Sequence, residues 1–160
     1  MQPANFVVVD DPQTRQALAE IYHKGMIVCR GSSRSARQLM ARHYVSEAFP
    51  QCTESAEYLA EHVHQVPVMV IPCLETWMHE YPERFTQATM MGSIVSAAWS
   101  FCLAAQAQGL GTTWTTLHLL FERDAAELLN ISYCDVRQIA LITLVHPPET
   151  DASQQTSHDR

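Results

Sequence analysis

The residue types that could carry chemistry are spread thinly along this sequence, and the cysteines show this most clearly. The closest two, Cys52 and Cys73, are 21 positions apart, so the chain has no Cys-x-x-Cys pair of the kind that holds zinc. An odd number of cysteines without close pairs is typical of reduced thiols in the cytoplasm, where most are small buried hydrophobic side chains. We therefore expect a cytoplasmic protein without disulfide bonds. The five cysteines are Cys29, Cys52, Cys73, Cys102 and Cys134.

Two other patterns suggest a metal site and a dinucleotide-binding site, but their spacing or their order of elements does not match such sites. His62 and His64 could ligate a metal, but side chains two positions apart on a helix point in different directions. Gly109-Leu-Gly111 looks like part of a dinucleotide-binding motif, yet Trp114 occupies the place of its third glycine and a helix precedes it where a strand should. No pair of side chains has the pattern of a nucleophile and its base. We assign no catalytic side chain and no metal ligand from sequence.

Positive charge is concentrated in one stretch of the chain. Five of the ten lysine and arginine residues lie between Lys24 and Arg42, and Gly31-Ser-Ser-Arg-Ser35 interrupts this stretch. Arginine side chains beside serine hydroxyls and backbone N–H groups can bind a phosphate group. A solvated helix face accounts for the same charges, so both interpretations stay open.

The elements that would position such residues follow from the pattern of apolar residues. Short runs of β-branched and apolar residues predict strands. These runs are Phe6–Val9, Val66–Ile71, Thr112–Thr116 and Gln138–Val145. Because proline is tolerated at strand ends, we expect Pro72 to end the second strand.

Helices are predicted between these strands. Asp11 followed by Pro12 is a typical helix start. The stretch Ser93–Gln108 is apolar on nearly every face, which predicts a long, buried, central helix that ends before Gly109. The stretch Glu75–Thr89 has no clear periodicity and is expected to be a loop or lid. Together the elements predict an α+β fold, a sheet flanked by helices.

Composition limits the classes of protein that remain. The chain has 160 residues, 47% hydrophobic and 17% charged, which predicts one compact domain over residues 1–148 and a disordered polar tail over 149–160. The net charge of −7 argues against a protein that binds nucleic acid. The apolar run Met90–Ala105 is shorter than the ~20 residues that span a bilayer, so we expect no membrane helix. The low charge content suggests that a partner subunit covers part of the surface.

An ordered set of segments resembles one protein family. The segment Ser93–Thr116, which ends in Gly-Leu-Gly-Thr-Thr-Trp-Thr-Thr, is similar to the central helix and the following Gly-Leu-Gly-Thr stretch of the nitroreductase family of FMN-dependent oxidoreductases. Gln2-Pro3-Ala-Asn-Phe-Val-Val-Val resembles the family's Gln-Pro-Trp-x-Phe-Val-Val-Val, and Val66-Pro-Val-Met-Val-Ile resembles its Ala-Pro strand. Phe121–Ile131 and Ile139–Pro147 look like the family's next helix and last strand.

The resemblance implies a nitroreductase-like α+β fold, with a mixed sheet flanked by helices and a long buried central helix. It also implies bound FMN, NADH or NADPH as reductant, and small oxidised or aromatic substrates. It also implies a homodimer, because the family builds its flavin sites between two subunits. The segment 114–117 would offer backbone groups to the flavin, which needs little from side chains. The residues that the resemblance implies for cofactor binding are Gln2, Pro3, Trp114, Thr115, Thr116 and Leu117.

The sequence departs from the family pattern where the phosphate of FMN would bind. Family members carry an N-terminal helix with an arginine- and serine-containing phosphate site, whereas this sequence begins at the Gln-Pro segment, so we expect that helix to be lacking. Arg160 is the only basic residue in the tail, and Ala4 replaces the family's tryptophan. Two hypotheses stay open. Either the true start lies upstream of Met1, or the chain is a shortened relative with weakened flavin binding. In the second case we expect other cations, such as those of Lys24–Arg42, to hold the phosphate, and the alternative function is a cofactor-poor, non-catalytic dimeric relative.

Overall fold

The computed structural model describes residues 4–31, 48–75 and 83–146. The strands are β1 (Ala4–Val9), β2 (Val68–Glu75), β3 (Gly111–Thr115), β4 (Val136–Gln138) and β5 (Leu141–Val145). The helices are α1 (Pro12–Gly31), α3 (Ala48–His62), α4 (Arg84–Ala107) and α5 (Glu122–Leu128), with the short 3-10 helices η1 (Val63–Gln65) and η2 (Leu117–Phe121).

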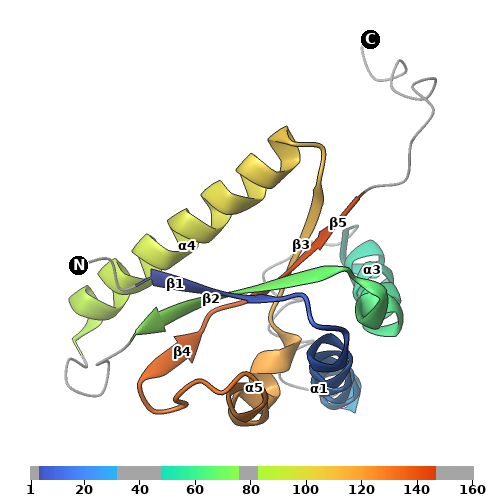
Figure 1. Ribbon diagram of the computed structural model, residues 1–160, viewed down its shortest axis with the longest axis horizontal. Coiled ribbons are helices and arrows are strands. Elements are labelled where there is room, and N and C mark those ends of the chain that lie inside the picture. Colours follow the sequence, from blue (N-terminus) through green and yellow to red (C-terminus); the bar gives the residue numbers. More distant parts are fainter. Residues whose placement is uncertain (1–3, 32–47, 76–82, 147–160) are drawn as a thin grey trace.

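These elements form one sheet with helices on both faces. The sheet is five-stranded in the order β1-β2-β5-β3, and β4 pairs with β2 beside this path. Helices α1, α3 and α5 lie on one face of the sheet, and α4 lies across the other (Figure 1). The larger core fills the space between the sheet and α1, and two smaller clusters lie under α4.

The central strand β2 has a nearly continuous apolar sequence. Such a sequence is typical of a strand that is covered on both faces of the sheet. β1 pairs along one side of it, while β5 pairs with Val68–Val70 and β4 with Cys73–Glu75 along the other. The prediction that Pro72 ends this strand is wrong. Position 72 lies between the β5 and β4 pairings, where its missing N–H breaks no ladder bond, and its carbonyl still accepts from the Ile139 N–H at 2.9 Å.

Helix α1 begins where its sequence predicts. One carboxylate oxygen of Asp11 accepts hydrogen bonds from the backbone N–H and the hydroxyl of Thr14, both at 2.8 Å. Such a cap satisfies a backbone donor in the first turn and stabilises the helix by about 1 kcal/mol. Arg15 donates to the Val66 carbonyl and ties the helix to the chain that enters β2. The residues that α1 buries in the core include Leu18, Ile21, Tyr22 and Met26.

Helix α4 buries only one of its sides. The buried residues recur every three or four positions and are Ile94, Ala98, Cys102 and Ala105. The adjoining side, about 100° around the helix, exposes Val95, Trp99 and Leu103, at 42%, 58% and 50% of their surface. By length and composition alone α4 could cross a membrane, a test that core helices also pass. The prediction that this helix is buried on nearly every face is therefore wrong for the described chain.

The α+β fold predicted from sequence is confirmed, with differences in detail. Every pairing in the described sheet is antiparallel, whereas the resemblance implies a mixed sheet. The last predicted strand is two strands, β4 and β5. The predicted loop over 75–89 is wrong in its last part, since α4 begins at Arg84. The tail 149–160 lies outside the described residues, and the division of the chain at residue 148 stays a prediction.

Candidate functional site

The segment that resembles the family's flavin-contacting stretch lies at the end of β3, an edge strand of the described sheet. The strand ends at Thr115, Thr116 is the N-cap of η2, and η2 begins at Leu117. The first hydrogen bond of this turn runs from the Leu119 N–H to the Thr116 carbonyl at 3.0 Å. The N–H groups of Leu117 and His118 precede that bond, so η2 itself provides no acceptor for them. Leu117 is half-buried and His118 is fully buried, so of these two donors only the N–H of Leu117 belongs to a residue with exposed surface.

The side chains of Trp114 and Thr115 are both engaged within the protein. Successive side chains of a strand point to opposite faces of the sheet. Trp114 packs under α4, against the clusters that contain Ala98 and Ile94. Thr115 faces α1, where its hydroxyl oxygen lies 2.8 Å from the hydroxyl oxygen of Tyr22. What this segment can offer a ligand is therefore its backbone and the exposed Thr116.

Helix α1 packs closely behind this segment. A Cβ atom at Gly25 would overlap the carbonyl oxygen of Leu117 and lie 2.9 Å from its carbonyl carbon, so the two backbones approach as only glycine allows. The next residue, His118, is fully buried, and neither of its ring nitrogens has a hydrogen-bond partner in the described part of the chain. Burial lowers the pKa of His118 to about 4, so the ring is neutral at pH 7.

The buried His118 predicts a specific loss of stability in acid. The unfolded chain takes up a proton on this ring below about pH 6.5, and the folded chain does so only near pH 4, so the free energy of unfolding falls over that window. The contribution between pH 7.5 and pH 5 is about 2 kcal/mol. In urea unfolding, His118→Leu is expected to lose that part of the pH dependence, and exposed His146→Leu is expected to retain it. Equal pH dependence in wild type and His118→Leu would contradict the assignment.

Sequence reasoning does not identify Tyr22 or Gly25 as part of this region. From sequence, Tyr22 is predicted only to lie on the buried side of α1 with the other apolar residues. Gly25 does leave a signal, because glycine inside a helix costs about 1 kcal/mol relative to alanine and often marks a close contact. The contact itself cannot be located from sequence, since its partner Leu117 is far away along the chain.

The residues expected to lie near the flavin rim or its phosphate are described only in part. Arg30, at the end of α1, pairs with Glu57 of α3 at 3.1 Å. Both side chains are solvent-exposed, and such a pair contributes about 1 kcal/mol or less to stability. The residues of these predictions that lie outside the described part of the chain are Gln2, Pro3, Arg34, Arg37 and Arg42.

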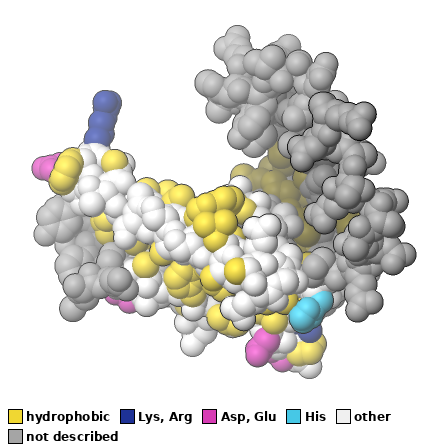
Figure 2. All heavy atoms as spheres, turned by 90° about the horizontal axis from the view of Figure 1, so that it is seen from above, with side chains coloured by type: hydrophobic (Ala, Val, Ile, Leu, Met, Phe, Trp, Pro, Cys, Tyr) yellow, Lys and Arg dark blue, Asp and Glu magenta, His cyan; other side chains and the backbone are white. Residues whose placement is uncertain are grey.

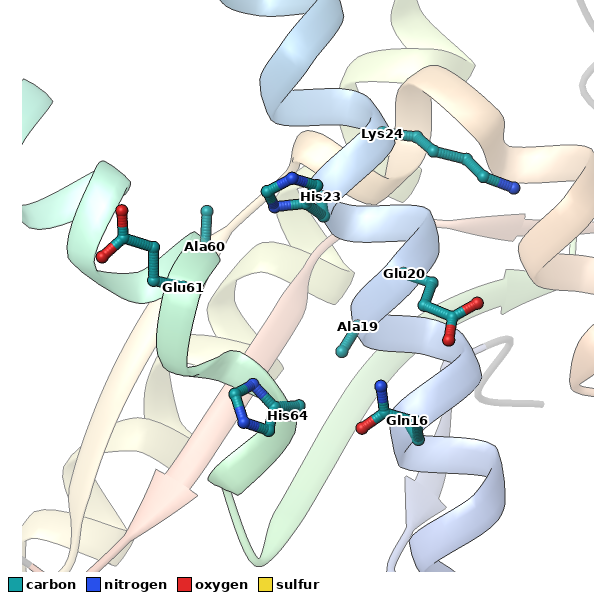
Figure 3. A pocket seen from close by; sticks show the side chains of 8 residues that line it. All are labelled: Gln16, Ala19, Glu20, His23, Lys24, Ala60, Glu61 and His64. Carbon is teal, nitrogen blue, oxygen red and sulfur yellow. The ribbon is translucent and has the colours of Figure 1, made fainter.

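A pocket of about 530 Å³ lies between α1 and α3, apart from the end of β3 (Figure 3). Ala19 and Ala60 are its buried residues, and longer polar side chains surround them. His64 lines this pocket, whereas His62 stacks on the ring of Tyr58. Within the described ranges no three histidine, cysteine or carboxylate side chains come together as metal ligands. The lining residues are Gln16, Ala19, Glu20, His23, Lys24, Ala60, Glu61 and His64.

The α4 side of the molecule exposes an apolar surface. Figure 2 shows hydrophobic side chains gathered along this side. On β1, Phe6 packs its ring against Phe101 of α4, at 6.1 Å between centroids, and remains partly exposed. On α4, Val95, Trp99 and Leu103 follow one another along the helix, and exposed apolar patches of this kind mark protein–protein contacts or ligand sites. We call this surface the α4 face and define it by Phe6, Val8, Met91, Val95, Trp99 and Leu103.

Comparison with solved structures places this arrangement in a known fold. The FMN and NADPH-dependent nitroreductase NfnB from sphigopyxis sp. strain HMH matches with a TM-score of 0.61 at 15% identity, over 93% of this chain and 71% of that one. Oxidized iodotyrosine deiodinase bound to FMN and 3-iodo-L-tyrosine matches with a TM-score of 0.62 at 15% identity, over 93% and 69% of the two chains. The NADPH:FMN oxidoreductase from Vibrio harveyi complexed with NAD+ gives 0.60 at 15% identity, over 92% of this chain and 52% of that one.

Identities this low establish a shared fold and nothing finer. No curated protein matches the sequence. The sequence profile of the nitroreductase family, in contrast, matches residues 1–145. Since this match spans nearly all of the 160 residues and the fold agrees with it, the chain belongs to the nitroreductase family.

Proposed function

We propose that this protein is an FMN-dependent oxidoreductase that transfers electrons from NADH or NADPH to small oxidised or aromatic substrates. The observation that carries the proposal is the segment Trp114–Leu117 at the end of an edge strand. Its first two side chains are held within the protein, and η2 does not use the N–H of Leu117. NfnB is FMN- and NADPH-dependent and the Vibrio harveyi protein is an NADPH:FMN oxidoreductase, which supports the same cofactors here.

We infer that the end of β3 can hold the ring system of FMN, because Thr116 is exposed there and η2 does not use the N–H of Leu117. When bound, FMN would accept a hydride from the nicotinamide and pass electrons to the substrate, while the protein supplies binding, orientation and electrostatics. In this proposal the backbone of Thr116 and Leu117 holds an edge of the ring. The packed side chains of Trp114 and Thr115 keep that backbone in place.

The phosphate of FMN needs a separate binding group. An unpaired phosphate in a cleft is costly, and arginine or lysine side chains with backbone N–H groups normally hold it. We propose the basic stretch Lys24–Arg42 for this role. Its described members Lys24 and Arg30 are solvent-exposed, and they lie on α1, the helix that packs behind η2.

We propose a homodimer that forms through the α4 face. After Arg84, α4 contains no charged residue, although a helix with one side in water normally carries charge there. Val95, Trp99 and Leu103 follow one another at intervals of four residues and so form one stripe. A second copy would cover that stripe, as the hydrophobic centre of a stable interface requires. A cytoplasmic location remains a prediction.

Activity of the reconstituted protein tests the proposed function. After incubation with FMN and removal of the excess, we expect oxidation of NADH or NADPH that depends on a nitroaromatic or quinone acceptor, measured at 340 nm. The control is free FMN at the concentration that the protein retains. Bound flavin that neither nicotinamide reduces would favour the alternative of a non-catalytic dimeric relative.

A further inference from the structure

We propose that helix α1 acts as a clamp on the β3–η2 junction and that Tyr22 is a positioning residue for the flavin. The inference rests on the proposed function, because it assigns a role toward a cofactor that the Trp114–Leu117 backbone would bind. Tyr22 and Gly25 lie three positions apart on α1 and so face the same way. They meet the junction at two different residues.

The first attachment is the hydrogen bond between Tyr22 and Thr115. Tyr22 is 1% exposed, and its hydroxyl oxygen lies 2.8 Å from that of Thr115. Burial raises the pKa of Tyr22, so the hydroxyl keeps its proton and the bond joins two neutral groups. Thr115 is the last residue of β3, so this bond holds the strand at the point where the chain leaves the sheet.

The second attachment is the contact of Gly25 with the backbone of Leu117. The absence of a side chain at Gly25 lets the helix approach the Leu117 carbonyl directly, closer than any other residue would permit. The two attachments lie on either side of Thr116, which is itself exposed. Helix α1 therefore holds the peptide groups next to Thr116 on one side, while Thr116 itself is exposed to solvent.

A clamp of this kind should affect the binding of reduced FMN more than the binding of oxidised FMN. Hydrogen-bond donors that are fixed in advance need no reorganisation when charge develops on a bound group. The reduced flavin carries more negative charge than the oxidised flavin, so loosening the donors weakens the binding of reduced FMN more than that of oxidised FMN. The midpoint potential of the bound flavin then becomes more negative.

The test uses Tyr22→Phe, which removes one oxygen atom and keeps the buried ring. Tyr58→Phe is the matched control, because Tyr58 is exposed on α3 and its ring stacks on His62. We expect Tyr22→Phe to bind oxidised FMN about fivefold more weakly, the size of one neutral hydrogen bond, and to lower the midpoint potential. Thr115→Val should reproduce both effects, and Thr115→Ser, which keeps the hydroxyl, should restore wild-type values.

A second readout needs no cofactor. In protein without FMN, amide hydrogen exchange at residues 116–118 should be faster in Tyr22→Phe than in wild type or in Tyr58→Phe. The clamp would be overturned if wild type binds FMN and Tyr22→Phe changes neither the amide exchange at residues 116–118 nor the midpoint potential of the flavin. The proposed function would remain intact in that case. Wild type that binds no FMN would overturn the proposed function and, with it, the role of Tyr22 toward the flavin.

Discussion

Trp99→Glu is expected to convert the protein from a dimer into a monomer. Trp99 is 58% exposed in one chain, at the centre of the stripe that includes Val95 and Leu103. In the proposed dimer this side chain is buried against the second copy. A carboxylate there would be an unpaired charge in an apolar contact, which costs about 3–5 kcal/mol. Because a two-fold interface contains each residue twice, the dimer should weaken by well over a hundredfold.

Light scattering at micromolar concentration measures this outcome. Wild type should have the mass of two chains and Trp99→Glu the mass of one. The matched control is Tyr58→Glu, which replaces an exposed aromatic residue on α3, on the other side of the sheet. A wild-type monomer, or a Trp99→Glu variant that stays dimeric, would show that the α4 face is not the interface.

Gly25→Ala is expected to destabilise the fold by about 2 kcal/mol. In an ordinary helix position this change would stabilise by about 1 kcal/mol, because alanine has the higher helix propensity. Here the added methyl group would overlap the Leu117 carbonyl, and both obstructing atoms belong to the backbone, which cannot rotate away. Overpacking of this kind costs about 1–3 kcal/mol and forces α1 away from η2.

Thermal unfolding measures the change, and for a chain of this length we expect a midpoint lower by about 6 °C. The control is Glu20→Ala, on an exposed position of the same helix, which should stay within about 0.5 kcal/mol of wild type. A Gly25→Ala variant as stable as wild type would mean that α1 and η2 can separate without loss. The clamp proposed for Tyr22 would then lack its second attachment.

The strands were predictable because each is a short apolar run bounded by polar residues, proline or glycine. The helix start at Asp11 was predictable for a local reason, since the cap and its partner Thr14 are three residues apart. The course of β2 through Pro72 was not predictable, because it depends on where β4 and β5 pair with it. Pairing partners far apart in sequence leave no trace in the pattern of one strand.

In the candidate site too, local features could be predicted from sequence and contacts between distant residues could not. Composition and spacing alone would place Trp114 in an ordinary buried strand, and only the resemblance of the whole segment pointed to a cofactor. The bond between Tyr22 and Thr115 joins residues 93 positions apart, and each residue has an unremarkable local sequence. The sequence predicts that α4 is apolar, but it does not predict which side of the helix packs on the sheet and which side is exposed.

Binding of FMN to the purified protein tests the central claim most directly. After incubation with excess FMN and gel filtration, we expect the protein to elute with flavin absorbance near 450 nm, at a ratio approaching one FMN per chain. The fluorescence of the retained flavin should be quenched by the protein around it. A colourless protein that retains no FMN at any concentration tested would contradict the account, even though the chain has the fold of a flavoprotein family.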